Sequence, residues 1–149
     1  IKNKGKVYIV GNGGSSSIAS HVSVDFSKVA RIQSSTFNNS NLITCFANDY
    51  GYENWVSNAL NFYADSNDVV ILISSSGQSK NIINAAVKAK EIGLSVITFS
   101  GFLESNPLKK MGDVNLWVNS SEYNIVESVH LIWLLSIVDY LISNKKTET

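Results

Sequence analysis

Five short runs of apolar and β-branched residues recur along the chain, and each is too short to form a helix. Most of the intervals between them hold longer segments in which apolar residues return at helical spacing behind capping residues. The runs cover residues 7–10, 42–47, 69–73, 95–99 and 114–118, and the helical segments cover residues 15–29, 52–63, 79–92 and 125–142. This alternation predicts an α/β domain.

The run at residues 69–73, Val-Val-Ile-Leu-Ile, contains no polar side chain. A strand covered by helices on both faces has such a continuous apolar run, whereas a strand with one solvated face alternates. The sequence therefore predicts a doubly wound, three-layer sandwich with a five-stranded parallel sheet and right-handed crossovers. Residues 31–41, rich in Ser and Asn, are predicted to form the most mobile loop, and Pro107 is predicted to start a short helical turn.

Composition and charge narrow the classes of partner. The 149 residues are 44% hydrophobic, which suffices for one packed domain, and 12 basic residues balance 12 acidic ones. A net charge of zero provides no attraction to nucleic acid or to an anionic membrane surface, so we expect neither partner. Residues 125–142 approach membrane-spanning length, but Glu127, His130, Ser136 and Asp139 interrupt them. We expect a helix buried by the rest of the protein or by an oligomer.

The only cysteine, Cys45, lies in the apolar run 42–47. No internal disulfide can form, and the sequence predicts a buried thiol in a reducing compartment, which favours a cytoplasmic protein. Residues 1–6 lack the pattern of a secretory signal peptide. They enter the first strand pattern at once, and we expect a chain that is truncated upstream.

Ligands of doubly wound sheets bind beyond the carboxyl ends of the strands, which directs attention to the loops 11–17, 48–53 and 74–80. The first loop is a glycine turn that leads into a serine-capped helix, a combination that allows close backbone approach to an anion. A dinucleotide fingerprint fits poorly, because Ser16 replaces its third glycine and no acidic residue ends the second predicted strand. A tight turn without a ligand stays an alternative.

The third loop, Ser74-Ser-Ser-Gly-Gln-Ser, places four hydroxyl groups beside the free N–H groups of a helix start. The nucleotide P-loop is absent, because Gly77 is not followed by the Gly-Lys-Ser/Thr spacing. This loop predicts a phosphate monoester rather than a nucleoside triphosphate, and no nucleotide cofactor is expected. The alternative is a serine-rich helix cap.

Three strings of residues together resemble the loops of the SIS (sugar isomerase) domain family, and in particular those of its phosphoheptose isomerases. They are Gly11-Asn-Gly-Gly-Ser, Ala47-Asn-Asp-Tyr-Gly-Tyr-Glu and Ser74-Ser-Ser-Gly-Gln-Ser. The similarity extends from residue 7 to about residue 142. It implies a single SIS domain over residues 1–149 with a flavodoxin-like strand order, without the N-terminal helical segment of phosphoheptose isomerases. It also implies a homotetramer whose active sites are built from neighbouring subunits.

The resemblance implies a phosphorylated sugar as substrate and an isomerase that moves a proton between adjacent carbons through an enediol. The leading reaction converts sedoheptulose 7-phosphate to D-glycero-D-manno-heptose 7-phosphate, in heptose supply for lipopolysaccharide, capsule or related glycans. The substrate contacts that it implies, with the serines holding the phosphate, are Asn12, Gly13, Gly14, Asn48, Asp49, Ser74, Ser75, Ser76 and Ser79.

Such a reaction needs a base and an electrophile. His21 and Asp25 are spaced i, i+4, so they share a helix face and can bind one metal or form an acid/base pair; a surface ion pair is the alternative. The resemblance places a metal-ligand histidine at His21, a catalytic glutamate at Asp25 and a metal- and substrate-binding glutamine at Glu127. The hypothesis is that Asp25 and Glu127 are catalytic and that His21, Asp25 and Glu127 bind one zinc ion.

The family's last metal-binding histidine falls at Leu135. Two readings follow from this departure and from those at Asp25 and Glu127. In the first, Glu127 supplies the catalytic carboxylate and isomerisation continues; in the second, the protein keeps the sugar-phosphate pocket and acts as a non-catalytic regulator or assembly protein. His130 is either a further metal ligand or a core histidine bonded to a backbone carbonyl.

Overall fold

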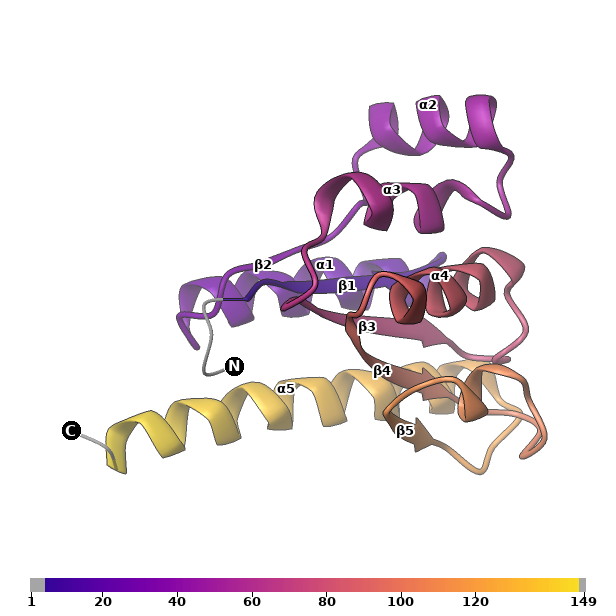
Figure 1. The fold of residues 1–149 in the computed structure, drawn as a ribbon. Coiled ribbons are helices and arrows are strands. Elements are labelled where there is room, and N and C mark those ends of the chain that lie inside the picture. Colours follow the sequence, from indigo (N-terminus) through magenta and orange to yellow (C-terminus); the bar gives the residue numbers. More distant parts are fainter. Residues whose placement is uncertain (1–4, 148–149) are drawn as a thin grey trace.

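A computed structural model describes residues 5–147 of the chain. One parallel sheet holds five strands in the order β2-β1-β3-β4-β5, which confirms the predicted five-stranded doubly wound sheet and its flavodoxin-like order (Figure 1). The strands are β1 (Val7–Gly11), β2 (Ser34–Ser35), β3 (Val69–Ser74), β4 (Ser95–Ser100) and β5 (Val114–Trp117).

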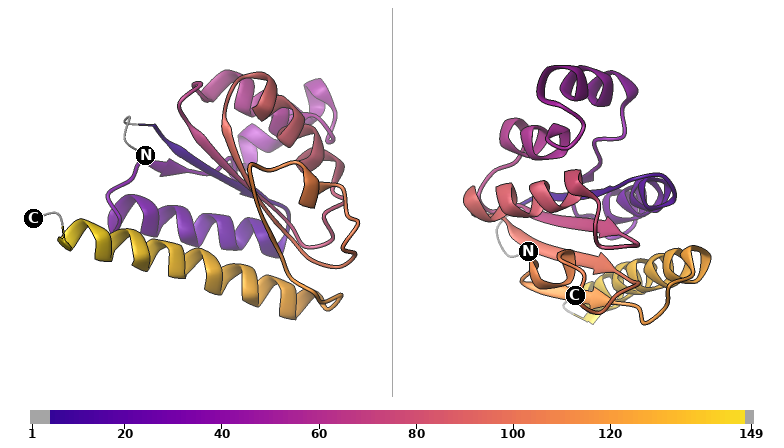
Figure 2. Two further views of the ribbon diagram at one scale, coloured as in Figure 1. Left: turned by 60° about the horizontal axis from the view of Figure 1, so that its bottom comes forward. Right: turned by 90° about the vertical axis from the view of Figure 1, so that its right-hand side faces the viewer.

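Helices cover both faces of the sheet. They are α1 (Gly14–Lys28), α2 (Ser40–Tyr50), α3 (Trp55–Tyr63), α4 (Lys80–Glu91) and α5 (Tyr123–Thr147), with a short 3₁₀ helix, η1 (Leu108–Lys110), before β5. Helices α1 and α5 run side by side along one face, and α3 and α4 cover the other (Figure 2). Pro107 immediately precedes η1, as predicted.

The alternation of β3 explains why its sequence is continuously apolar. Val70 and Leu72 point into the core beneath α3 and α4, whereas Ile71 and Ile73 point into the core beneath α1 and α5. All four side chains are buried. A strand between two helical layers buries both of its faces, and this places the carboxyl end of β3 in the middle of the sheet.

The strand predicted at residues 42–47 is wrong, because these residues belong to α2. The Asn39 side chain caps this helix by accepting the N–H groups of Asn41 and Leu42, at 2.9 and 3.4 Å. Apolar residues such as Leu42 and Phe46 then fall on one helical face, which packs against the core. A capped amphipathic helix has won over a weak strand propensity.

The second strand is instead β2, which lies inside the segment 31–41 that was predicted to be a loop. Its two residues pair in parallel with Val7 and Tyr8 of β1 at the sheet edge. A strand this short and polar is typical of a sheet edge, because an edge strand forms backbone hydrogen bonds with a neighbouring strand on one side only. The Phe37 ring, buried and stacked on Tyr8 with 5.0 Å between ring centroids, anchors the rest of the segment.

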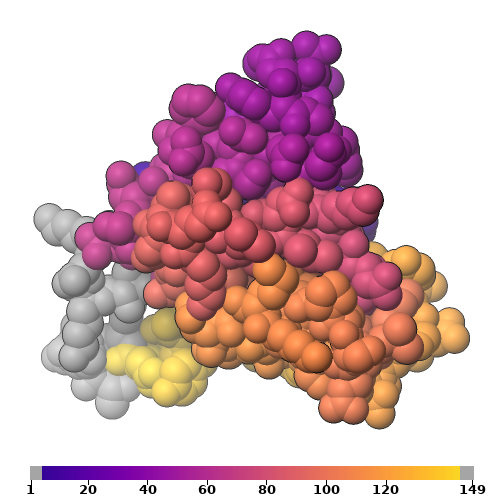
Figure 3. All heavy atoms as spheres, turned by 45° about the vertical axis from the view of Figure 1, so that its right-hand side comes forward, coloured from indigo at the N-terminus to yellow at the C-terminus, as the bar shows by residue number. Residues whose placement is uncertain are grey.

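The prediction that Cys45 is buried is also wrong, because α2 lies outside the two core layers. Helix α2 stands on α3 at the outer end of the molecule, and it has no fully buried residue (Figures 1 and 3). Cys45 is exposed, with its Sγ 3.8 Å from Asp49 Oδ2. The Cys45 thiol is therefore not part of the hydrophobic core.

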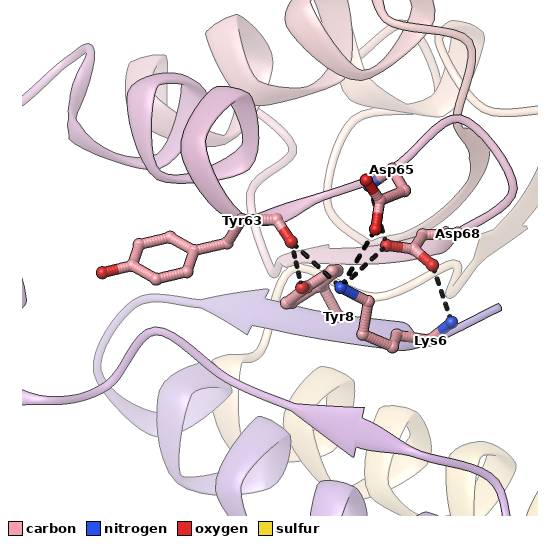
Figure 4. Close-up of polar contacts among 5 residues, drawn as sticks. All are labelled: Lys6, Tyr8, Tyr63, Asp65 and Asp68. Carbon is pink, nitrogen blue, oxygen red and sulfur yellow. Dashed lines mark hydrogen bonds and ion pairs between the residues drawn. The ribbon is translucent and has the colours of Figure 1, made fainter.

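A polar cluster ties the start of β1 to the connection between α3 and β3 (Figure 4). Asp68, almost fully buried, accepts the backbone N–H of Lys6 at 2.7 Å, while Lys6 Nζ donates to the Tyr63 carbonyl at 3.2 Å. Tyr8 donates its hydroxyl to the same carbonyl. These bonds hold the amino ends of β1 and β3 together, at the end of the sheet opposite to the loops that follow these strands.

Helix α5 is only partly buried by its own chain. Leu134 and Val138 pack into the core with α1, whereas Ile125, Ile132 and Tyr140 are exposed. Among the described helices, α5 is the one long and apolar enough to cross a membrane, and 22% of its most apolar window is buried. Core helices of soluble proteins reach the same length and hydropathy. The described chain covers only one side of this helix, and its burial by an oligomer stays a prediction.

Candidate active site

A cavity of about 290 Å³ lies beyond the carboxyl ends of β1 and β3, and we call it the switch-point cavity. Helix α1 leaves β1 toward one face of the sheet and α4 leaves β3 toward the other, so the two strands flank the topological switch point. Doubly wound folds bind ligands at this position. Its lining residues are Asn12, Gly13, Gly14, Ser15, Ile73, Ser74, Ser75, Ser76, Ser79, Tyr123 and Glu127.

The serines of the β3–α4 loop leave hydroxyl groups available inside the cavity. Ser79 is the N-cap of α4, yet its side chain forms no capping hydrogen bond and instead accepts the Ser74 hydroxyl at 3.0 Å. Ser75 is 6% exposed, and its hydroxyl has no hydrogen-bond partner. A serine-rich cap does not describe this loop, because the cap residue does not cap. The hydroxyls and the start of α4 have the arrangement expected of an anion cradle, as the sequence predicted.

The β1–α1 loop brings backbone and a carboxylate into contact. A Cβ atom on Gly14 would lie 2.3 Å from Glu127 Oε2, so only glycine lets the Glu127 side chain of α5 rest against the start of α1. Gly13, the residue before it, has a φ of +54° that favours glycine. The conformation of this loop thus depends on both glycines.

The Asn12 side chain is held by residues that sequence reasoning missed. Asn12 and Asn81 exchange two amide hydrogen bonds of 2.9 Å, and the Tyr52 hydroxyl donates to Asn12 Oδ1 at 3.3 Å. Asn81 lies in the first turn of α4 and is 2% exposed. The pair therefore joins the two loops of the switch-point cavity. The only sequence signal for this pair is the position of Asn81 just after the predicted helix cap. Nothing in the sequence indicates that Tyr123 lines the cavity.

An Asn81→Ala variant is expected to bind a sugar phosphate about fivefold more weakly, because Asn12 loses a partner worth about 1 kcal/mol that fixes its amide. Isothermal titration calorimetry measures the change. Asn84→Ala is the control, since this residue lies one turn further along α4 and bonds the Glu53 carbonyl outside the cavity. Equal losses of affinity in both variants would contradict a role for the Asn12–Asn81 pair.

His21 and Asp25 form a pair, as their spacing predicted, with His21 Nε2 3.4 Å from Asp25 Oδ2. Neither residue lines the switch-point cavity that contains Glu127. Between residues 5 and 147, no three His, Cys, Asp or Glu side chains cluster closely enough to hold a metal ion. The donor set of one chain therefore does not fit the predicted zinc site, which stays a prediction that needs a second subunit.

Asn48 and Asp49 also lie outside the lining of the switch-point cavity. Both are exposed in the last turn of α2, where Asn48 Nδ2 donates to Asp49 Oδ1 at 2.9 Å. The predicted strand-to-helix loop at 48–53 is thus a helix end followed by a turn, in which Gly51 has a φ of +81°. Their predicted contact with substrate remains untested within one chain.

His130 is a core histidine, which confirms one of its two sequence interpretations. Its ring is fully buried, Nε2 lies 3.1 Å from the Ser100 carbonyl oxygen, and its edge meets the Phe99 ring. Burial lowers the pKa of His130 from its ordinary 6.5, and the hydrogen bond to Ser100 offsets part of this shift. The folded protein therefore favours the neutral imidazole.

Because the pKa of His130 is lower in the folded than in the unfolded chain, the unfolded chain binds more protons below pH 6.5. The stability contributed by neutral His130 is complete above that pH and is lost as the pH falls toward the folded-state pKa. We expect His130→Gln to show a smaller fall in its urea midpoint between about pH 7.5 and about pH 5 than the native chain. His21→Gln controls for the loss of a histidine. A fall in the urea midpoint of His130→Gln that equals the fall in the native chain would refute the assignment of this pH dependence to His130.

The fold and the switch-point cavity define a doubly wound α/β protein with a serine- and glycine-lined cavity between its two central loops. The sequence pattern of the SIS domain matches residues 1–101, and the chain belongs to the SIS domain family. Phosphoheptose isomerase of Helicobacter pylori (strain Shi470) is 31% identical over 145 residues, which cover 93% of this chain and 75% of that protein.

Two further comparisons agree. A probable phosphoheptose isomerase of Thermoplasma acidophilum is 34% identical over 139 residues, which cover 88% of this chain and 75% of that protein. The solved structure of a phosphoheptose isomerase from Neisseria gonorrhoeae superposes with a TM-score of 0.88 at 26% identity, covering 95% of this chain and 78% of that one. The predicted resemblance to this branch of the family is confirmed.

Proposed function

We propose that the protein is a sugar-phosphate isomerase that interconverts a ketose phosphate and an aldose phosphate, most directly sedoheptulose 7-phosphate and D-glycero-D-manno-heptose 7-phosphate. One observation carries the proposal: the switch-point cavity combines an anion cradle at the start of α4 with a single carboxylate, that of Glu127. The similarity to phosphoheptose isomerases supports the choice of sugar. A cytoplasmic role in heptose supply for surface glycans is part of the proposal.

The phosphate binds at the start of α4, where free backbone N–H groups and the hydroxyls of Ser75 and Ser79 donate to its oxygens, while the Ser74 hydroxyl donates to Ser79. This end of the ligand does not react, so its binding energy serves to position the other end. The sugar then extends toward Asn12 and Glu127 on the opposite wall of the switch-point cavity.

Glu127 acts as the base in this proposal. Its carboxylate takes a proton from C1 of the ketose, the electrons of that C–H bond form the C1–C2 double bond of the enediol, and the carboxyl group, after its proton exchanges with solvent, delivers a proton to C2. The hydroxyl proton on O1 moves to O2, so that the product is the aldose. Donors near the reacting end, the Asn12 amide among them, stabilise the negative oxygen of the intermediate.

The remaining predicted site residues require a second subunit. We propose a homotetramer in which the exposed apolar side of α5 is buried and in which His21, Asp25, Asn48 and Asp49 of a neighbouring chain complete the site. The exposed Ile125, Ile132 and Tyr140 support a contact along this helix. No catalytic step is assigned to zinc, because the ligands within one chain do not fit it.

An Ile132→Glu variant of the proposed tetramer is expected to dissociate into smaller species. The tetramer contact along α5 would have to bury the introduced carboxylate without a partner, and this is energetically costly. Ile132 is 60% exposed in the single chain, so the substitution leaves the core intact. Light scattering behind size-exclusion chromatography gives the mass. Val87→Glu, at an exposed position of α4, is the control and should keep the native mass; a native mass for Ile132→Glu would exclude this surface.

Leu135 favours one alternative, a non-catalytic protein that binds a sugar phosphate. The resemblance places a metal-binding histidine at this position, and here Leu135 is a partly buried apolar residue that packs against the core on the α1 and α5 side of the sheet. This alternative keeps the anion cradle but moves no proton. It differs from the isomerase in one measurable property, the exchange of carbon-bound hydrogen.

A proton NMR time course of sedoheptulose 7-phosphate in heavy water, with and without added zinc, tests the function. Isomerisation through an enediol introduces deuterium at C1 or C2 and produces the aldose signals. Line broadening of the sugar without deuterium incorporation would reject the isomerase and support the binding protein. Absence of both would reject the sugar-phosphate site.

A further inference from the structure

Glu127 is the only charged side chain among the lining residues of the switch-point cavity. None of the ion pairs formed within residues 5–147 involves it. The cavity therefore combines an anion cradle with one carboxylate that forms no ion pair within the described residues. An anionic ligand experiences attraction at one wall and repulsion at the other.

Two helices begin at the cavity, α1 at Gly14 and α4 at Lys80. Each start carries the positive end of a helix dipole and attracts an anion. At the start of α1, the N-cap residue Gly13 has no side chain and the first turn has no acidic residue. The Glu127 carboxylate rests against Gly14 there and occupies the position that an anion would take. The protein thus supplies its own anion to α1 from α5.

At α4 no acidic side chain occupies the corresponding place. The first turn of α4 contains no Asp or Glu, and Ser79 forms no capping bond. The buried Ser75 hydroxyl lines the cavity without a partner, so its hydrogen-bonding capacity is unused. A buried hydroxyl without a partner is costly, and a ligand oxygen removes the cost. The two walls therefore differ in what they accept.

We infer that Glu127 makes the switch-point cavity selective for a sugar phosphate with one anionic group, and that it excludes ligands with a second anion at the opposite end. The inference rests on the proposed sugar-phosphate site and extends it to charge selectivity. A neutral hydroxyl group donates to the Glu127 carboxylate. An aldonate carboxylate or a second phosphate only accepts, and it meets a like charge.

Isothermal titration calorimetry with two ligands of equal length tests this selectivity. Glucitol 6-phosphate and gluconate 6-phosphate share the phosphate end and differ at C1, which is a hydroxymethyl group in the first and a carboxylate in the second. Neither ligand has a carbonyl group to isomerise, so binding is measured apart from turnover. A chelator is present throughout, so that no metal ion bridges Glu127 and the carboxylate.

The native chain is expected to bind glucitol 6-phosphate at least about tenfold more tightly than gluconate 6-phosphate, as expected for one like-charge contact at partial burial. Glu127→Gln keeps the size of the side chain and should abolish this preference. Ser79→Ala is the matched control at the other wall: it weakens both ligands by the same factor and leaves their ratio unchanged.

Each result decides the inference. An unchanged ligand ratio in Glu127→Gln, or a native preference for gluconate 6-phosphate, overturns the selectivity while leaving the sugar-phosphate site in place. Failure of the native chain to bind either ligand overturns the site and the selectivity together. A preference that disappears in Glu127→Gln, combined with no deuterium exchange in sedoheptulose 7-phosphate, upholds the selectivity and rejects only the isomerase.

Discussion

A Glu127→Gln variant is expected to transfer protons to and from a bound ketose phosphate about 10²- to 10⁴-fold more slowly than the native protein, the range usual for loss of a general base. The amide of glutamine has the shape of the carboxylate but cannot accept the C1 proton. Glutamine has the same size as glutamate and can make the same contact with Gly14, so we expect the fold to be preserved. The rate is read from deuterium incorporation by NMR.

Asp139→Asn is the control for this experiment. Asp139 also lies on α5, is exposed, and does not line the switch-point cavity, so the same chemical change there should leave the rate unaltered. Full activity in Glu127→Gln would show that the base is another group. Asp25 of a neighbouring subunit, the second predicted carboxylate, would then be tested by Asp25→Asn.

A Gly77→Ala variant is expected to lose about 3 to 5 kcal/mol of folding free energy. Gly77 has a φ of +66°, and a Cβ atom there would lie 1.9 Å from Asn106 Oδ1. Asn106 is fully buried, donates to the Leu103 carbonyl at 2.8 Å and accepts the Lys109 N–H at 3.0 Å. The substitution adds backbone strain, a collision and broken hydrogen bonds, and urea denaturation measures their sum.

Gly93→Ala separates the contribution of backbone strain from that of the collision. Gly93 also has a positive φ, +79°, but the nearest atom to a Cβ there is Ser66 Cβ at 3.7 Å. We expect this control to lose only about 1 to 2 kcal/mol, the cost of a left-handed backbone for alanine. A loss of equal size in the two variants would show that Asn106 moves away without cost.

The success of sequence reasoning varied from strand to strand. Strands β1, β3 and β4 were predicted closely, because a strand buried on both faces has a continuous apolar run. Strand β2 was missed, since two serines at a sheet edge have no pattern to detect. Residues 42–47 have strand-like composition, and only the Asn39 cap and contact with the core make them a helix.

The candidate site was predictable in its loops and less so in its connections. Glycine turns and serine-rich helix starts can be recognised locally, and Gly13, Gly14, Ser74 and Ser79 do line one cavity. The Asn12–Asn81 pair and the Tyr123 wall depend on segments far apart in the chain. Likewise, the i, i+4 spacing correctly paired His21 with Asp25 but carried no information on their distance from Glu127.

The sequence by itself determined the β/α alternation, the parallel sheet, and the glycine-rich and serine-rich loops that line the switch-point cavity. These follow from periodic burial and from the backbone freedom of glycine, which act over a few residues. The tertiary structure alone decided that Glu127 rests on Gly14 and that Asn81 holds Asn12. It also decided that His21 and Asp25 lie outside the lining of the switch-point cavity. Contacts between distant segments depend on how whole layers pack, and local sequence patterns do not specify that packing.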